Sequence, residues 1–127
     1  MGENTRDLAV RAEQRTRGLA PTDTTWRTPT LINSWANFGG AYAPASYRKD
    51  GAGFVHLRGL VKTGLAGSTV FVLPVGFRVD ASGQELFVTI ANGVVASIEV
   101  LPAGDVYSSA AGTSYVSLAG ITFYAGT

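Results

Sequence analysis

The sequence contains no cysteine, and this absence excludes disulfide bonds, thiolate catalysis and cysteine-based metal sites. It contains one histidine, His56, so no second imidazole is present to share a metal ion with it. The formal net charge of +1 provides no electrostatic reason to bind nucleic acid or an anionic membrane surface. No apolar run approaches the roughly 20 residues that a bilayer span needs. We therefore expect no metal, no cofactor, no nucleic-acid partner and no membrane insertion.

Residues arranged for catalysis are also scarce. No serine lies in a G-x-S-x-G turn, and no glycine cluster leads from a strand into a helix. Asp50, Asp80 and Asp105 lie in predicted turns, where aspartate is ordinarily solvated. Glu99 lies within a predicted strand, and a glycan-cleaving site would need a second carboxylate facing it at a set separation. We expect no catalytic residue and no enzymatic activity.

The residues that are present have the composition of a small β domain. The 127 residues suffice for one domain, and 46% hydrophobic content with 15% charge is typical of a globular chain. The 16 glycines and the short apolar runs favour strands and turns over helices. Short strands at regular spacing predict a β-sandwich or a barrel.

The stretch from Tyr47 to Val61 predicts the central hairpin. Asp50-Gly51-Ala52-Gly53 is a turn, because aspartate bonds its own downstream backbone and glycine accepts a positive φ. Beyond the turn we expect one continuous strand to Val61. Its apolar face, interrupted by Gly59, alternates with a polar face that carries His56 and Arg58. Such a strand buries the first face and presents the second to water or to a partner.

Other strands follow from alternation and turn signals. Asn92-Gly93 is the strongest hairpin signal, and the strand before it alternates Leu86, Val88 and Ile90 against Phe87. Strands are predicted over residues 69–73, 77–79, 85–90, 94–101, 106–107, 114–118 and 121–124, after an extended segment at 26–32 and a loop at 33–44.

The apolar pattern near the end of the chain changes parity at Ala119-Gly120. It passes from Val116 and Leu118 to Ile121 and Phe123. A glycine bulge within one bent strand explains the change, and a tight hairpin is the alternative.

Residues 3–19 form the predicted helix of the chain. Its apolar positions are Leu8, Ala12 and Leu19, with Arg15 at the intervening position, in the 4-3-4 spacing of a coiled coil. An isolated helix of this length is marginal in water. The alternatives are a solvated helix and the last turns of a coiled-coil stalk, and the arginine at a core-type position favours the stalk. Residues 20–25 have the composition of a linker.

Aromatic residues provide the remaining candidates for binding. One group clusters before and within the central hairpin: Trp26, Trp35, Phe38, Tyr42 and Tyr47. Such side chains stack on sugars or form protein interfaces, but in a small β domain they usually fill the core. Tyr107 and Tyr115 flank a loop of small residues, which favours their exposure, so they are the candidate ligand contacts. A lone histidine on a polar strand face, such as His56, is most often a surface or interface residue.

Four stretches together resemble the C-terminal head domains of tail-fibre and baseplate receptor-binding proteins of tailed bacteriophages. They read W-R-x-P-x-L-x-N-x-W, P-A-S-Y-R-K-D-G-x-G-x-V-H-L-R-G-L-V, F-V-L-P-x-G-F-R and V-S-L-A-G-I-x-F. In this chain they are Trp26–Trp35, Pro44–Val61, Phe71–Arg78 and Val116–Phe123. The resemblance therefore spans about the last 100 residues, and the combination of pieces is more specific than any one of them.

The resemblance implies a mainly β protein that assembles as a homotrimer. Residues 26–127 would form an antiparallel, jelly-roll-like β-sandwich head. Residues 1–25 would be the linker and the end of a coiled-coil stalk from a longer gene product. Leu8, Ala12 and Leu19 are then the expected trimer contacts of the stalk. His56 and Arg58 are the expected contacts at a seam between heads, because arginine is favoured at interfaces.

The resemblance also implies a virion component that acts outside the cell. Its expected role is to attach the phage to a bacterial cell-surface saccharide, with the rest of the tail fibre or baseplate as its other partner. Tyr107 and Tyr115 are the candidate receptor contacts. Two alternatives stay open, a purely structural trimerisation or capping module and a glycan-cleaving tail enzyme.

Overall fold

The computed structural model describes residues 24–80, 82–110 and 114–126, and these residues are mainly β. They form ten strands: β1 (Ala36–Asn37), β2 (Ser46–Lys49), β3 (Phe54–Arg58), β4 (Leu60–Lys62), β5 (Ser68–Val72), β6 (Glu85–Ala91), β7 (Val94–Val100), β8 (Asp105–Ser108), β9 (Val116–Ser117) and β10 (Thr122–Tyr124). The predicted helix over residues 3–19, with Leu8, Ala12 and Leu19, lies outside the described residues.

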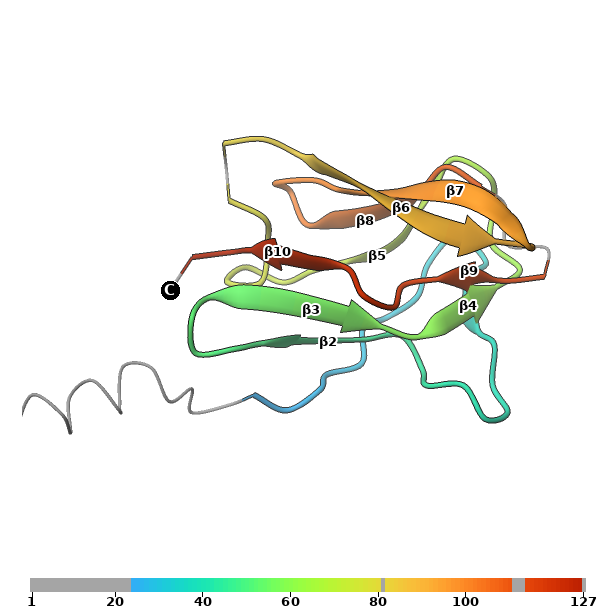
Figure 1. Ribbon diagram of the computed structural model, residues 1–127, viewed down its shortest axis with the longest axis horizontal. Helices are drawn as coiled ribbons and strands as arrows, with labels where there is room; N and C mark the ends of the chain where they lie inside the picture. Colours follow the sequence, from blue (N-terminus) through green and yellow to red (C-terminus); the bar gives the residue numbers. More distant parts are fainter. Residues whose placement is uncertain (1–23, 81, 111–113, 127) are drawn as a thin grey trace, which may run out of the picture.

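The strands form two antiparallel sheets. In Figure 1, β6, β7 and β8 of the larger sheet lie above the smaller sheet, and β4 and β9 continue at the level of β3 and β10. The seven-stranded sheet has the order β1-β4-β9-β6-β7-β8-β5, and the three-stranded sheet has the order β10-β3-β2. The mainly β class and the antiparallel pairing that the sequence predicts are therefore confirmed. The segment before β1 enters beside β2, where Arg27 forms an isolated bridge with Tyr47.

The chain crosses from one sheet to the other at two glycines. At Gly59 it leaves β3 and enters β4, so the single strand predicted from Phe54 to Val61 is wrong and two strands of different sheets replace it. Gly59 has a φ of +119°, and a Cβ there would lie 2.6 Å from backbone atoms of Ala45. Only glycine allows this close passage of two backbone segments.

The second crossing follows the first and lies beside it. β9 pairs with β4 in the large sheet, and after Gly120 β10 pairs with β3 in the small sheet. The backbone N–H of Leu118 donates to the carbonyl oxygen of Gly59 at 2.9 Å, so the two crossings are bonded together. β9 and β10 do not pair with each other, so the hairpin alternative is excluded, and two strands of different sheets stand where one bent strand was expected.

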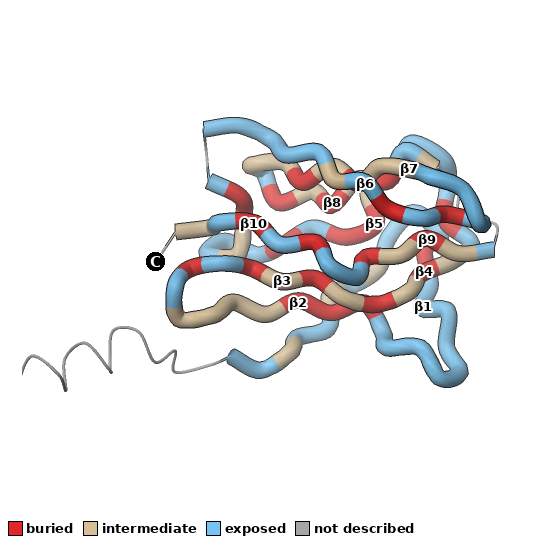
Figure 2. The backbone as a smooth tube through the Cα atoms, in the orientation of Figure 1, coloured by how far each residue is buried: buried red, intermediate tan, exposed pale blue. Residues whose placement is uncertain are grey.

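The core fills the space between the sheets. Figure 2 shows buried residues recurring along β3, β5 and β8, and these belong to one hydrophobic core. Rings from the two layers meet there, with Tyr47 stacked near Phe71 and Phe87 near Phe123. Because these contacts join both sheets, the inner face of each sheet is shielded from solvent by the other.

Trp35 closes the end of the core near β5. Its side chain is 4% exposed, and its Nε1–H donates to Oγ of Ser68 at 2.9 Å. Gly64 lies directly against the indole, where a Cβ would overlap the ring. Trp35 and Tyr47 are thus core residues, whereas Tyr42 and Phe38 from the same aromatic group are exposed.

Three local expectations differ from the structure. Residues 26–32 contribute one bridge instead of an extended strand, and the loop predicted over 33–44 contains β1. Residues 77–79 form no strand, because the Phe77 amide bonds back to the Pro74 carbonyl and Arg78 Nε bonds to the Leu73 carbonyl. These bonds fold the segment into a turn that runs across the end of β5.

Candidate functional site

The residues given in the structure hold no cluster that could bind a metal ion, where three or more His, Cys, Asp or Glu side chains would be needed. Within the same ranges, no helix is long and apolar enough to cross a membrane. The search for a site therefore turns to polar networks, hollows and the outer faces of the two sheets.

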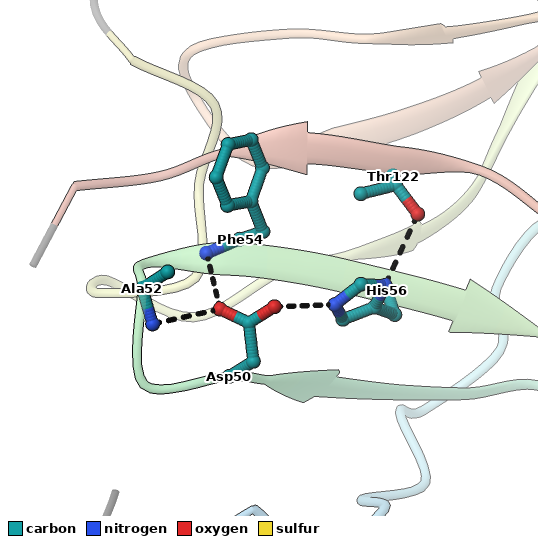
Figure 3. A network of polar contacts seen from close by, with 5 residues as sticks. All are labelled: Asp50, Ala52, Phe54, His56 and Thr122. Atoms are coloured by element: carbon teal, nitrogen blue, oxygen red, sulfur yellow. Dashed lines mark hydrogen bonds and ion pairs between the residues drawn. The ribbon is translucent and has the colours of Figure 1, made fainter. Parts of the chain in front are cut away.

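His56 belongs to a polar network on the outer face of the three-stranded sheet (Figure 3). Its Nε2 lies 2.8 Å from Oδ2 of Asp50, and its Nδ1 lies 3.1 Å from Oγ1 of Thr122. The other oxygen of Asp50 accepts hydrogen bonds from the backbone amides of Ala52 and Phe54, both at 3.0 Å. The network thus ties the turn before β3 to β3 and, through Thr122, to β10.

Asp50 is held in its ionised form by this network. The hydrogen bond with His56 lowers the pKa of the Asp50 carboxyl below its usual value, and the amides of Phe54 and Ala52 lower it further, against the opposing effect of burial. Both partners keep about a third of their side-chain surface in solvent, at 27% for His56 and 31% for Asp50. Solvent screens the pair at that exposure, so its contribution to stability is small.

The network has the hydroxyl, imidazole and carboxylate groups of a catalytic triad, but the hydroxyl and the carboxylate are hydrogen-bonded to the opposite ring nitrogens. In a triad the acid holds Nδ1 and the nucleophile lies at Nε2, whereas here Asp50 is at Nε2 and Thr122 at Nδ1. The three side chains lie on an open strand face, and none of them lines either hollow described below. The arrangement fits a brace for the hairpin turn.

Two arginines of the same face pack against Trp26. The guanidinium carbons of Arg58 and Arg48 lie 4.1 Å and 5.2 Å from the centroid of the indole ring, close enough for cation–π attraction. Nε of Arg58 is buried and has no hydrogen-bond partner among the described residues. His56 and Arg58, the predicted seam residues, thus share one face, but both have partners within this chain.

Two hollows open on the surface. The larger, of about 420 Å³, lies between residues 28–32 and the turn after β5, with Tyr47 and Arg78 in its lining. The smaller, of about 310 Å³, lies beside the Gly59 crossing. Its lining is largely apolar and includes the exposed residue Tyr42 together with Arg58 and Ser117. No carboxylate lines either hollow.

The two predicted receptor contacts lie against different turns. Tyr107 is half-buried on β8, with its hydroxyl close to Gly67. Tyr115 is half-buried beside the Asn92-Gly93 turn, and its amide donates to Oδ1 of Asn92 at 2.8 Å. Neither tyrosine lines either of these two hollows, and their role in binding stays a prediction.

An apolar surface that the sequence analysis did not single out lies on the outer side of β6 and β7. Leu86, Val88, Ile90 and Val95 are 66%, 78%, 53% and 77% exposed. Ile90 pairs directly with Val95, so the β6 row continues onto β7. We call these four residues the β6–β7 apolar face. The core takes the opposite side of β6, which carries Phe87, Thr89 and Ala91.

Comparisons with known proteins agree with the fold. No protein-family model matches the chain, and no curated protein matches its sequence. Among solved structures, the chain is similar to the crystal structure of the receptor binding protein (gp15) of Listeria phage PSA, with a TM-score of 0.69 and 21% identity. The likeness covers 99% of this chain and 79% of that one. At this identity, the likeness establishes a shared fold.

Proposed function

We propose that this chain is the head of a phage receptor-binding protein and attaches the virion to a bacterial surface. The observation that carries the proposal is the shared fold with the gp15 receptor binding protein over nearly the whole of this chain. The four sequence stretches that resemble phage head domains point independently to the same class. The proposal places the protein on the phage tail, outside the cell when it acts, with the tail fibre or baseplate as its partner.

The proposed receptor is a cell-surface saccharide, and the smaller hollow is the first place to test for its site. The lining of that hollow is largely apolar, and the exposed residue Tyr42 contributes to it together with Arg58 and Ser117. A tyrosine ring is a group that stacks on the apolar face of a sugar. Tyr107 and Tyr115 are the second place to test, on the sequence argument given above.

The proposed head is a non-enzymatic homotrimer. Glycan cleavage needs two carboxylates facing a bound sugar. Glu99, the strand carboxylate, accepts a hydrogen bond from Gln84 at 3.2 Å and lines neither hollow. Sharing a core among three copies suits a small head without disulfide bonds, because closed symmetry adds buried surface without open-ended growth.

Cell binding tests the proposal directly. Fluorescently labelled full-length chain is added to Listeria cells, chosen because the similar structure comes from a Listeria phage, and to a panel of other bacteria. We expect binding to at least one strain that periodate oxidation of the cell-wall sugars abolishes and protease treatment leaves intact. Binding that survives periodate and not protease would contradict a saccharide receptor, and no binding to any strain would contradict attachment.

Variants locate the saccharide site. We expect Tyr42→Ala to weaken cell binding at least tenfold, while Tyr124→Ala, which removes an exposed ring remote from the hollow, leaves it unchanged. Tyr107→Ala and Tyr115→Ala are measured beside them. If they weaken binding and Tyr42→Ala does not, the site lies at the sequence-predicted tyrosines.

A structural trimerisation or capping module is the second candidate function, and the β6–β7 apolar face favours it. A module of that kind would associate through this face and bind none of the cells or glycans tested. Silence on a glycan array, together with a stable oligomer, is the result that would favour this function over attachment.

A further inference from the structure

Neither the fold nor the proposed saccharide site explains the β6–β7 apolar face. Four aliphatic side chains, each more than half exposed, lie side by side across two paired strands. Isolated exposed apolar residues are normal on a protein surface, but a contiguous set marks a contact surface. The next strand pairs of the same face add Ser97, opposite Val88, and Glu99, opposite Leu86.

The edge of β6 is also open. β6 pairs with β9 at a single position, Ala91 with Val116, so its outer edge from Glu85 to Ile90 has no strand partner among the described residues. Edge strands that stay in water are normally protected by lysine, proline or a bulge. The hairpin over residues 85–100 contains no Lys, Arg or Pro, and its strands pair without a register shift. Apart from the charge of Glu85 at the start of β6, the sequence thus lacks the usual protection against association at this edge.

We infer that a second copy of this chain covers the β6–β7 apolar face, with the same face of each copy turned toward the shared axis. Leu, Ile and Val side chains offer no hydrogen-bond donor or acceptor, so a saccharide is a poor occupant. Another copy carries an identical aliphatic surface, and Glu99, which lies opposite Leu86 at one end of the face, can keep its charge in the polar rim when the two meet.

The size of the face fits this role. At about 30 Å² for each exposed carbon, the four side chains expose roughly 300 Å² of apolar surface. A standard interface buries about 800 Å² on each partner, with an apolar centre and a polar rim. The face can serve as that centre, and Ser97, Glu99 and Tyr107 on the neighbouring strands can form its rim. The inference names the surface for the self-association within the proposed function, and it does not depend on cell binding.

The test compares two exposed valines. Val88 is 78% exposed inside the face, and Val75 is 82% exposed on a loop outside it. The molar mass of full-length wild type, Val88→Lys and Val75→Lys is measured by light scattering after size exclusion, over a range of concentrations. We expect wild type and Val75→Lys to associate, and Val88→Lys to elute as a single chain of 13.2 kDa. Circular dichroism checks that each variant is folded.

A second variant keeps the test independent of one substitution. Val95→Lys places the same charge on β7, at a residue 77% exposed, and is expected to dissociate the assembly as Val88→Lys does. An assembly that survives both variants would overturn the inference, since the contact would lie elsewhere.

A wild-type chain that is monomeric at every concentration would also overturn the inference, whether residues 1–23 or an unrelated apolar partner covers the face. Cell binding by such a monomer would leave the attachment role standing. A wild-type oligomer that binds no cells would leave the inference standing and remove the attachment role, so the two failures are distinguishable.

Discussion

The outer faces of the two sheets differ in what covers them. The face of the three-stranded sheet is covered from within the chain, because Trp26 packs on Arg48 and Arg58 and His56 is bonded to Asp50 and Thr122. The outer side of β6 and β7 is aliphatic, and no described residue covers it. The polar face that the sequence predicts as a subunit contact thus has partners within the chain, and its contact with another copy stays a prediction. The apolar face is the one that we propose as the subunit contact.

The largest effect is expected at Gly59, where the chain passes from the three-stranded sheet to the seven-stranded sheet. Gly59→Ala combines a strained φ of +119° with a Cβ 2.6 Å from the Ala45 backbone, so we expect a loss of more than about 3 kcal/mol in unfolding free energy. Urea denaturation measures this loss. The matched control is Gly120→Ala, where φ is +82° and no atom lies within 4 Å of the Cβ, so strain alone should cost about 1 kcal/mol.

Equal losses at the two glycines would show that backbone strain is the whole effect. The close approach of the Ala45 backbone to Gly59 would then contribute nothing to the loss of stability.

A smaller effect is expected from uncovering the three-stranded face. Trp26→Ala removes the ring that packs on Arg48 and Arg58, and we expect the unfolding free energy to fall by about 2 kcal/mol. Trp26→Phe keeps an aromatic face for the arginines and should lose less than half as much. If neither change affects stability, the N-terminal segment does not cover this face in solution.

The smallest effect is a pH dependence at Asp50. Hydrogen bonds lower the pKa of Asp50 in the folded chain, so its ionised form favours folding. That contribution is complete above the usual aspartate pKa of 3.8 and is lost as the pH falls through the lowered pKa of Asp50. We expect wild type to lose more stability than Asp50→Asn between about pH 5 and pH 2, measured by thermal unfolding.

Local sequence signals predicted the turns and bends well. Asn92 and Gly93 both take a positive φ in the hairpin between β6 and β7, as their residue types require. The parity change at Ala119-Gly120 correctly predicted a bend, because the inward-facing side of a strand is readable from the apolar pattern. Gly59 stood out in the sequence as an interruption of the apolar strand face. Its crossing between sheets depends on strand partners, which alternation does not specify.

The sequence pattern does not predict which face of β6 is buried. One side carries Leu86, Val88 and Ile90, and the other carries Phe87 and Ala91, so both sides are apolar enough to be buried. Which side meets the core is decided by the other sheet, through contacts such as that of Phe87 with Phe123. The contact of His56 with Thr122 could not be predicted either, because the two residues lie 66 positions apart in the sequence.

Amide hydrogen exchange compares the two faces most directly. It is measured on wild type, Val88→Lys and Val75→Lys, and read by peptides covering β6–β7 and β2–β3. If a second copy covers the apolar face, exchange along the open edge of β6 is faster in Val88→Lys than in the other two chains, and β2–β3 is alike in all three. Equal protection of β6 in all three chains, or a change confined to β2–β3, would contradict the account.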